Sequence, residues 1–162
     1  MKNPIAILAE IIKQNNIELS FNIIEVGAVK IEDAQEPFYQ ILNYFPSSQI
    51  IGFELEEEVC KKMNAEAKKG IKYYPYALGK ANEKRKLYIT QNPMCSSLYK
   101  PNEELIKLYN RFEVAYLKEE TEINTITLDY FIEQNKIGEI DFIKIDVQGA
   151  ELDVFKGGKK TL

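Results

Sequence analysis

Apolar side chains recur at helical spacing near the start of the chain, at Ile5, Leu8, Ile11 and Ile12. They follow Asn3-Pro4, which pairs a capping residue with a first-turn proline. This pattern predicts an N-terminal helix within residues 1–20, ahead of a domain that we place at residues 21–162.

Strand-like and helix-like segments alternate after that helix. Apolar stretches predict buried strands at residues 21–26, 48–55 and 71–78. Between them, Asp33 can cap a helix whose apolar stripe ends at Phe45. Residues 56–70 carry acids in the first turn, lysines in the last and Gly70 as a stop, which predicts a second helix. The β-α-β-α-β order predicts a parallel sheet with right-handed crossovers.

The second half of the chain also contains strand-like and helix-like segments. Further strands are predicted at residues 83–90, 112–118, 123–127 and 141–147. A polar loop covers residues 91–102, and Thr127 can cap a short helix that ends near Gly138. The stretch 141–147 is apolar on both faces except for Lys144, which is expected to contact a carboxylate or to mark a face near the sheet edge. Such a strand belongs inside a sheet, so we expect a longer domain whose last strands are missing here, or an edge covered by another subunit.

Composition and charge narrow the functions that remain. The chain has 162 residues, a net charge of −4 and a pI near 5.1, which argues against a nucleic-acid partner because phosphate binding needs a basic face. No apolar run approaches the roughly 18 residues of a membrane span, and no signal-peptide cleavage site is evident, so a cytoplasmic location is expected. The chain has no histidine, which excludes histidine-based catalysis. Cys60 and Cys95 lie far apart, so neither a disulfide nor a metal site is expected.

Acidic residues stand at the ends of the predicted strands. Gly27 follows the first strand and permits a sharp turn and close approach of a ligand, with Glu25 beside it. Glu54 ends the second strand, where an acid can accept hydrogen bonds from ribose hydroxyls. Asp146 ends a later strand, where it could bind a cation, orient a substrate or take a proton. Each residue also has a purely structural interpretation. Gly27 would simply form a turn, Glu54 would interact favourably with a helix dipole, and Asp146 would cap a helix.

One longer stretch has a family resemblance. "IDFIKIDVQGAELDVFKGG", preceded by "TITLDYFIEQNKI", resembles the signature of FkbM-family methyltransferases, and "EVGA", "FELE", "YALG" and "SSL" follow the family's order. The resemblance covers about Phe21 to Leu162. It implies an α/β fold of the Rossmann-like class I methyltransferase type, with a mostly parallel sheet and flanking helices. It also implies S-adenosylmethionine-dependent O-methylation of a saccharide or related small molecule.

The resemblance also implies roles for individual residues. The cofactor-binding positions would be Glu25, Gly27, Glu54, Leu55, Ala77 and Leu78. In this scheme Glu54 holds the ribose hydroxyls and Leu55 packs on adenine. Asp146 and Glu151 would lie near the methyl-transfer centre, either as a general base or as organisers of the loop and cofactor. Ser96 and Ser97 fall in a segment that lies near the acceptor pocket in the family, whereas Cys95 is expected to be incidental.

Three departures keep other hypotheses open. Ile31 stands where family members usually carry a second glycine, and its β-branched side chain disfavours positive φ. Gln148 replaces a usual acid, and the strands expected after Gly157-Gly158 are absent from the sequence. A degenerate Rossmann-like module with a non-catalytic binding role is therefore the alternative. An NAD-binding oxidoreductase comes last because it needs a G-x-G-x-x-G motif, which the loop lacks.

Overall fold

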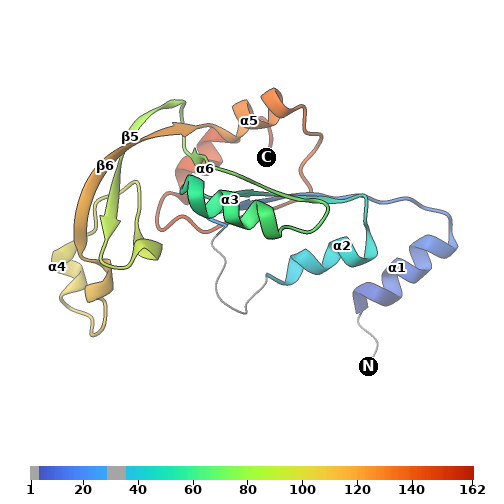
Figure 1. Cartoon of the computed structure of the whole chain (residues 1–162), viewed down its shortest axis with the longest axis horizontal. Helices are drawn as coiled ribbons and strands as arrows, with labels where there is room; N and C mark the ends of the chain where they lie inside the picture. Colours follow the sequence, from blue (N-terminus) through green and yellow to red (C-terminus); the bar gives the residue numbers. More distant parts are fainter. Residues whose placement is uncertain (1–3, 29–35) are drawn as a thin grey trace. The chain divides into compact units, whose positions relative to one another are not determined.

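The computed structural model describes residues 4–28 and 36–162, and the contacts between residues divide the chain into two compact units. The first unit comprises Met1–Pro75 and Gly138–Lys144. The second comprises Tyr76–Ile137 and Ile145–Leu162. Figure 1 labels the helices and some of the strands.

The first unit is built on a four-stranded sheet of order β3-β2-β1-β7. Its strands are β1 (Asn22–Val26), β2 (Gln49–Phe53), β3 (Ile71–Tyr74) and β7 (Phe142–Ile145). β1, β2 and β3 are parallel, with Val26 opposite Phe53 and Phe53 opposite Tyr74, so these three strands end at one edge. The predicted α/β fold with a mostly parallel sheet is confirmed.

Short helical segments accompany this sheet. They are α1 (Pro4–Gln14), the 3-10 helix η1 (Pro37–Gln40), α2 (Ile41–Tyr44) and α3 (Glu57–Glu66). Ile23 of β1, Tyr39 of η1 and Ile50 of β2 form a buried cluster against which Phe38 and Ile41 pack. The predicted N-terminal helix is confirmed, and α1 packs against α2. Asp33, the predicted cap of the second helix, and Ile31 lie outside the described residues.

The second unit is built on a three-stranded sheet of order β4-β6-β5. Its strands are β4 (Ala77–Leu78), β5 (Glu83–Thr90) and β6 (Leu117–Ile126). β5 and β6 form a long antiparallel pair, drawn in Figure 1 as a curved ribbon with α4 (Glu103–Ile106) at one end. The connection between them also carries two 3-10 turns, η2 (Pro93–Cys95) and η3 (Glu113–Ala115).

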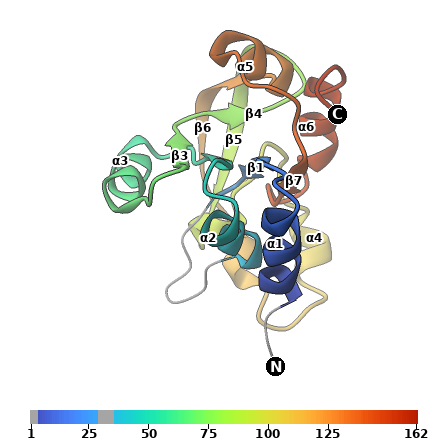
Figure 2. The same ribbon diagram turned by 90° about the vertical axis from the view of Figure 1, so that its right-hand side faces the viewer.

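Two helices complete the second unit, α5 (Leu128–Asn135) and α6 (Glu151–Gly157), which contact each other (Figure 2). Thr127 caps α5 as predicted, since its hydroxyl accepts the Tyr130 N–H at 3.1 Å. Gly157, at the end of α6, packs directly on the Gly79 carbonyl, where a Cβ would collide with that oxygen. The glycine is thus required for the close approach of α6 to the segment after β4.

Three predicted strands have different limits in the structure. The strand expected at residues 71–78 is divided at Pro75 into β3 and β4, which belong to different sheets. Proline has no N–H to donate to a ladder, which explains the interruption. The strands expected at 112–118 and 123–127 correspond to one strand, β6, which begins at Leu117 and runs through the polar stretch between them. Pairing with β5 holds that stretch, and Lys86 bonds Glu120 across the pair at 2.8 Å.

β7 confirms the strand predicted at residues 141–147 but not its burial. It occupies an edge of the four-stranded sheet, beside β1. With a strand on one side only, Ile143 and Ile145 are half-buried and Phe142 is 48% exposed. The Asp141 carboxylate accepts the Asn22 N–H at 2.8 Å and so ties the start of β7 to the start of β1.

Candidate functional site

The loop after β1 is fastened to the end of β2. Gly27 has a φ of +79°, the left-handed conformation that favours glycine. The N–H groups of Gly27 and Ala28 both donate to the Phe53 carbonyl, at 3.1 and 2.9 Å. Because Phe53 immediately precedes Glu54, these bonds bring the predicted glycine turn and the predicted ribose-binding acid to the same edge of the sheet.

Glu54 is a buried carboxylate at the end of β2. Its Oε1 accepts the Glu56 N–H at 2.8 Å, just ahead of α3, and its own N–H donates to the Tyr74 carbonyl. Burial raises the pKa of Glu54, although the hydrogen bond from Glu56 opposes the rise. A carboxylate can accept about four hydrogen bonds, so the bond from Glu56 leaves capacity for the two hydroxyls of a ribose. Leu55 follows and is half-buried.

Glu25 is bonded within the first unit. Its Oε2 accepts the Tyr39 hydroxyl, and that hydroxyl lies 2.9 Å from the Tyr73 hydroxyl. Lys144 places its Nζ 3.8 Å from Glu25 Oε1 and 3.3 Å from Glu36, which confirms the expected contact of Lys144 with a carboxylate. Burial raises the pKa of Glu25, against the opposing effects of Tyr39 and Lys144. We call Glu25, Tyr39, Tyr73 and Lys144 the Glu25 cluster; both oxygens of its carboxylate have protein partners.

The remaining predicted residues lie in the second unit. Ala77 and Leu78 form β4 and pair with Thr125 and Ile126 of β6, and Leu78 is buried. Asp146 follows β7, and its Oδ1 accepts the Gln148 side-chain amide at 3.3 Å. Glu151 opens α6 and accepts the Gly149 N–H at 3.1 Å.

The turn between these two acids is left-handed. Gln148 and Gly149 have φ values of +53° and +92°. Gly149 therefore supplies the predicted tight turn, and each acid bonds one residue of it. Both carboxylates therefore form hydrogen bonds within this loop.

Sequence reasoning missed Asp153, a buried acid on α6. It is 2% exposed and accepts hydrogen bonds from Arg85 at 3.2 Å and from the Tyr99 hydroxyl at 3.0 Å. Partial burial opposes the charge of Arg85, but the hydrogen bond that Arg85 donates to Asp153 raises the pKa of its guanidinium. We call these three residues the Asp153 cluster. The sequence contains a signal, because Ala150, Asp153, Val154 and Gly157 recur at helical spacing. In the structure all four are buried, so that Asp153 lies on the inner face of α6.

The second unit contains a pocket of about 410 Å³ beside this cluster. Residues 95–101 and 111–115 form most of its wall, and Gln148 completes it. Ser97 lines the pocket, and so does the half-buried Cys95. Ser96 instead accepts the Thr90 N–H at 3.3 Å. Since Gln148 also bonds Asp146, the pocket adjoins the loop of the two predicted catalytic acids.

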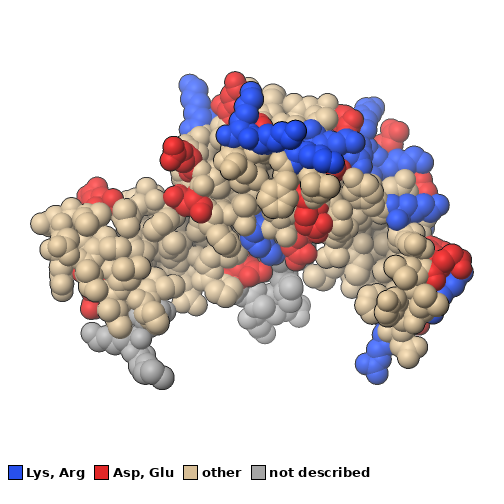
Figure 3. All heavy atoms as spheres, turned by 180° about the vertical axis from the view of Figure 1, so that it is seen from behind, with Lys and Arg blue, Asp and Glu red and all other residues tan. Residues whose placement is uncertain are grey.

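Searches for other kinds of site gave two further findings. Over residues 4–28 and 36–162, no group of three or more His, Cys, Asp or Glu side chains could hold a metal ion. None of the helices in the same residues is long and apolar enough to span a bilayer. Acidic and basic side chains are interspersed on the face drawn in Figure 3.

Comparison with known proteins gave one match. Residues 11–162 match the family described as the Methyltransferase FkbM domain. Searches of curated proteins and of solved structures found no match to the chain.

Proposed function

Because the chain belongs to the FkbM methyltransferase domain family, we propose that it is an S-adenosylmethionine-dependent O-methyltransferase acting on a hydroxyl of a saccharide or related small molecule. The family match over residues 11–162 carries this proposal. We further propose that residues 21–162 belong to the methyltransferase domain and that residues 1–20 contain an N-terminal helix.

The residues of the first unit fit a cofactor that bears a ribose. Glu54 is an anionic acceptor at the carboxyl end of a parallel strand, which is where such folds bind the ribose hydroxyls of nucleotides. Gly27, fastened beside it, turns the chain without a side chain in the way of a ligand. Glu25 already bonds Tyr39 and Lys144, so its role in this scheme is to orient the loop. Leu55 would supply an apolar contact to adenine, as the family resemblance implies.

In methyl transfer the protein mainly has to position the acceptor oxygen and remove its proton. When bound, S-adenosylmethionine supplies its methyl group as an electrophile on a sulfonium. The chain has to hold an acceptor oxygen in line and to remove its proton. In the absence of histidine, we assign proton removal to Asp146 or Glu151. The 410 Å³ pocket, which Gln148 connects to Asp146, is the proposed acceptor site.

Glu54→Gln tests the cofactor assignment. The amide keeps the shape and can still accept the Glu56 N–H, but charge-assisted bonds to ribose hydroxyls are lost. Affinity for S-adenosylhomocysteine, measured by titration calorimetry, should fall by roughly 10- to 100-fold, the equivalent of about 1.5–3 kcal/mol.

Glu58→Gln is the matched control, because it removes the same charge from an exposed position on α3 of the same unit. It should bind S-adenosylhomocysteine as the wild type does. Equal affinity in wild type and Glu54→Gln would remove Glu54 from the site. No heat from the wild-type protein with millimolar S-adenosylhomocysteine would overturn the methyltransferase proposal in favour of a non-catalytic module.

A further inference from the structure

The lining of the 410 Å³ pocket is positively charged in an acidic protein. Lys100 and Arg111 both line it, and no carboxylate does. The chain as a whole carries a net charge of −4, so the local sign is opposite to the overall one. In the described part of the chain Arg111 forms no ion pair, which leaves its fork of donors for a ligand.

Glu120 is a carboxylate that interacts electrostatically with Lys100, and it already forms an ion pair with another lysine. Glu120 of β6 bonds Lys86 at 2.8 Å. That bond, with a smaller contribution from Lys100, lowers the pKa of Glu120. Among the described residues, the ion pair of Glu120 is with Lys86 and not with Lys100.

Two aromatic rings give the pocket flat apolar surfaces. Tyr99 and Phe112 line it and are 48% and 53% exposed. The Tyr99 ring is held in place because its hydroxyl bonds the buried Asp153 and the Arg85 guanidinium lies 5.7 Å from its centroid. A fixed ring loses little freedom when a ligand packs on it. Rings combined with a few polar groups are typical of small-molecule sites of roughly 300–1,000 Å³, which includes this volume.

The backbone of the pocket wall is also unusual. Arg111 and Gln148 have φ values of +70° and +53°, and four non-glycine residues of the described chain have positive φ. Both therefore adopt a conformation that costs free energy for a residue with a side chain, and such residues cluster at ligand sites. Arg111 supplies charge, whereas Gln148 reaches Asp146.

From these observations we propose that the pocket recognises the anionic group of a negatively charged sugar, a carboxylate or a phosphate, through Arg111 and Lys100. The sugar ring packs against Tyr99 and Phe112, and an acceptor hydroxyl lies toward Gln148 and Asp146. This inference rests on the proposed function, whose acceptor class it narrows from saccharides in general to anionic ones.

Binding of three sugars tests the preference. D-glucuronate, D-glucose 6-phosphate and uncharged D-glucose are titrated into the protein by calorimetry, with saturating S-adenosylhomocysteine and low salt. At least one charged sugar should bind roughly tenfold or more tightly than glucose, as for a charge-assisted hydrogen bond. The stronger of the two identifies the anion as carboxylate or phosphate. Equal affinity for all three sugars would overturn the inference.

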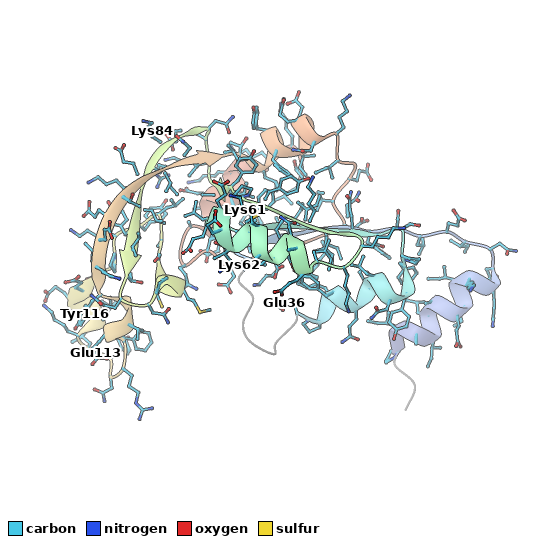
Figure 4. The ribbon with its side chains drawn as sticks, viewed as in Figure 1. Glu36, Lys61, Lys62, Lys84, Glu113 and Tyr116 are labelled. Atoms are coloured by element: carbon cyan, nitrogen blue, oxygen red, sulfur yellow. The ribbon has the colours of Figure 1, made fainter. Side chains whose placement is uncertain are left out.

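Charge-removing variants test the residues. Arg111→Gln and Lys100→Gln should each lower the affinity for the charged sugar by roughly 10- to 100-fold and leave the affinity for glucose unchanged. Lys84→Gln is the matched control: Lys84 belongs to the same unit but lies at the opposite end of the β5–β6 pair from Glu113 and Tyr116 (Figure 4). An equal loss in Lys84→Gln would indicate general charge attraction and contradict the assignment.

The two proposals fail in distinguishable ways. S-adenosylhomocysteine is titrated first, without sugar. Heat from this titration combined with no preference for charged sugars would refute the anionic pocket and leave the methyltransferase proposal standing. No heat from this titration would refute the methyltransferase proposal, and with it the role of the pocket as an acceptor site.

Discussion

Each of the two units contains a buried carboxylate that is bonded to a tyrosine hydroxyl and lies near a cation, but the two arrangements differ in strength. In the first unit Glu25 accepts the Tyr39 hydroxyl, and the Lys144 ammonium lies 3.8 Å away. In the second, Asp153 accepts the Tyr99 hydroxyl at 3.0 Å and a guanidinium N–H of Arg85 at 3.2 Å. The cation is thus hydrogen bonded in the Asp153 cluster and more distant in the Glu25 cluster.

The two tyrosines also face different surroundings. Tyr39 is 8% exposed, and burial, followed by its bond to Glu25, raises the pKa of its hydroxyl. Tyr99 is 48% exposed and lines the 410 Å³ pocket. Similar combinations of acid, tyrosine and cation therefore do different work: the Glu25 cluster fastens strands together, whereas the Asp153 cluster holds a ring at a pocket wall. The burial of the tyrosine decides which.

The largest difference is expected when each acid is neutralised. Asp153→Asn leaves a partly buried guanidinium without its closest carboxylate, and should lower the free energy of unfolding by about 2–3 kcal/mol. This is less than the full cost of breaking a buried pair, because Glu83 remains 3.6 Å from Arg85. Glu25→Gln should cost about 1 kcal/mol or less, since the amide still accepts the Tyr39 hydroxyl and the unfavourable burial of charge disappears. Urea unfolding followed by circular dichroism measures both.

The prediction is that Asp153→Asn loses more free energy of unfolding than Glu25→Gln does. Lys144 keeps Glu36 at 3.3 Å in Glu25→Gln, so neither variant strands its cation completely. If Glu25→Gln proved as destabilising as Asp153→Asn, the ammonium at 3.8 Å would have to stabilise the fold as strongly as the hydrogen-bonded guanidinium.

A smaller contrast is expected from the tyrosine hydroxyls. Tyr39→Phe removes the hydroxyl donor of a buried carboxylate and should cost about 1–2 kcal/mol. Tyr99→Phe should cost about 0.5 kcal/mol, because Asp153 keeps Arg85 and the ring is half exposed. Thermal unfolding of the two variants at one pH gives the comparison. A greater loss in Tyr99→Phe would show that the Asp153 cluster supports the fold and does more than hold the ring.

Several of these features could be predicted from the sequence, because they depend on local order. Glu25, Gly27 and Glu54 were placed at strand ends by the alternation of strands and helices, and Thr127 by its position ahead of an amphipathic helix. Lys144 interrupts an apolar strand, which predicts either a contact with a carboxylate or a face near the sheet edge, and the structure shows both.

Other features depend on contacts between distant segments and were beyond sequence reasoning. The pocket needs residues 95–101 and 111–115 to be brought together by the pairing of β5 with β6, and the sequence pattern predicts strands in this region but not which of them pair. The Tyr39 hydroxyl meets Glu25 only because η1 packs on the sheet. Asp153 lies two residues after Glu151, but the turn of the helix buries one acid and leaves the other at the loop.

The smallest expected effect is the pH dependence of the Glu25 cluster. Burial raises the pKa of folded Glu25 above the ordinary value of 4.5, so the folded state binds this proton more tightly than the unfolded state. The stability that results is fully present below pH 4.5 and is lost as the pH rises through the folded pKa. The free energy of unfolding of the wild type, minus that of Glu25→Gln, should therefore decrease from pH 4 to neutrality.

The free energy of unfolding of Tyr39→Phe should decrease more steeply over the same pH range than that of the wild type, because the Tyr39 hydrogen bond holds the pKa of Glu25 down. Urea unfolding at a series of pH values measures all three proteins, and an increase of the wild-type difference with pH would mean that Lys144 outweighs burial at this carboxylate.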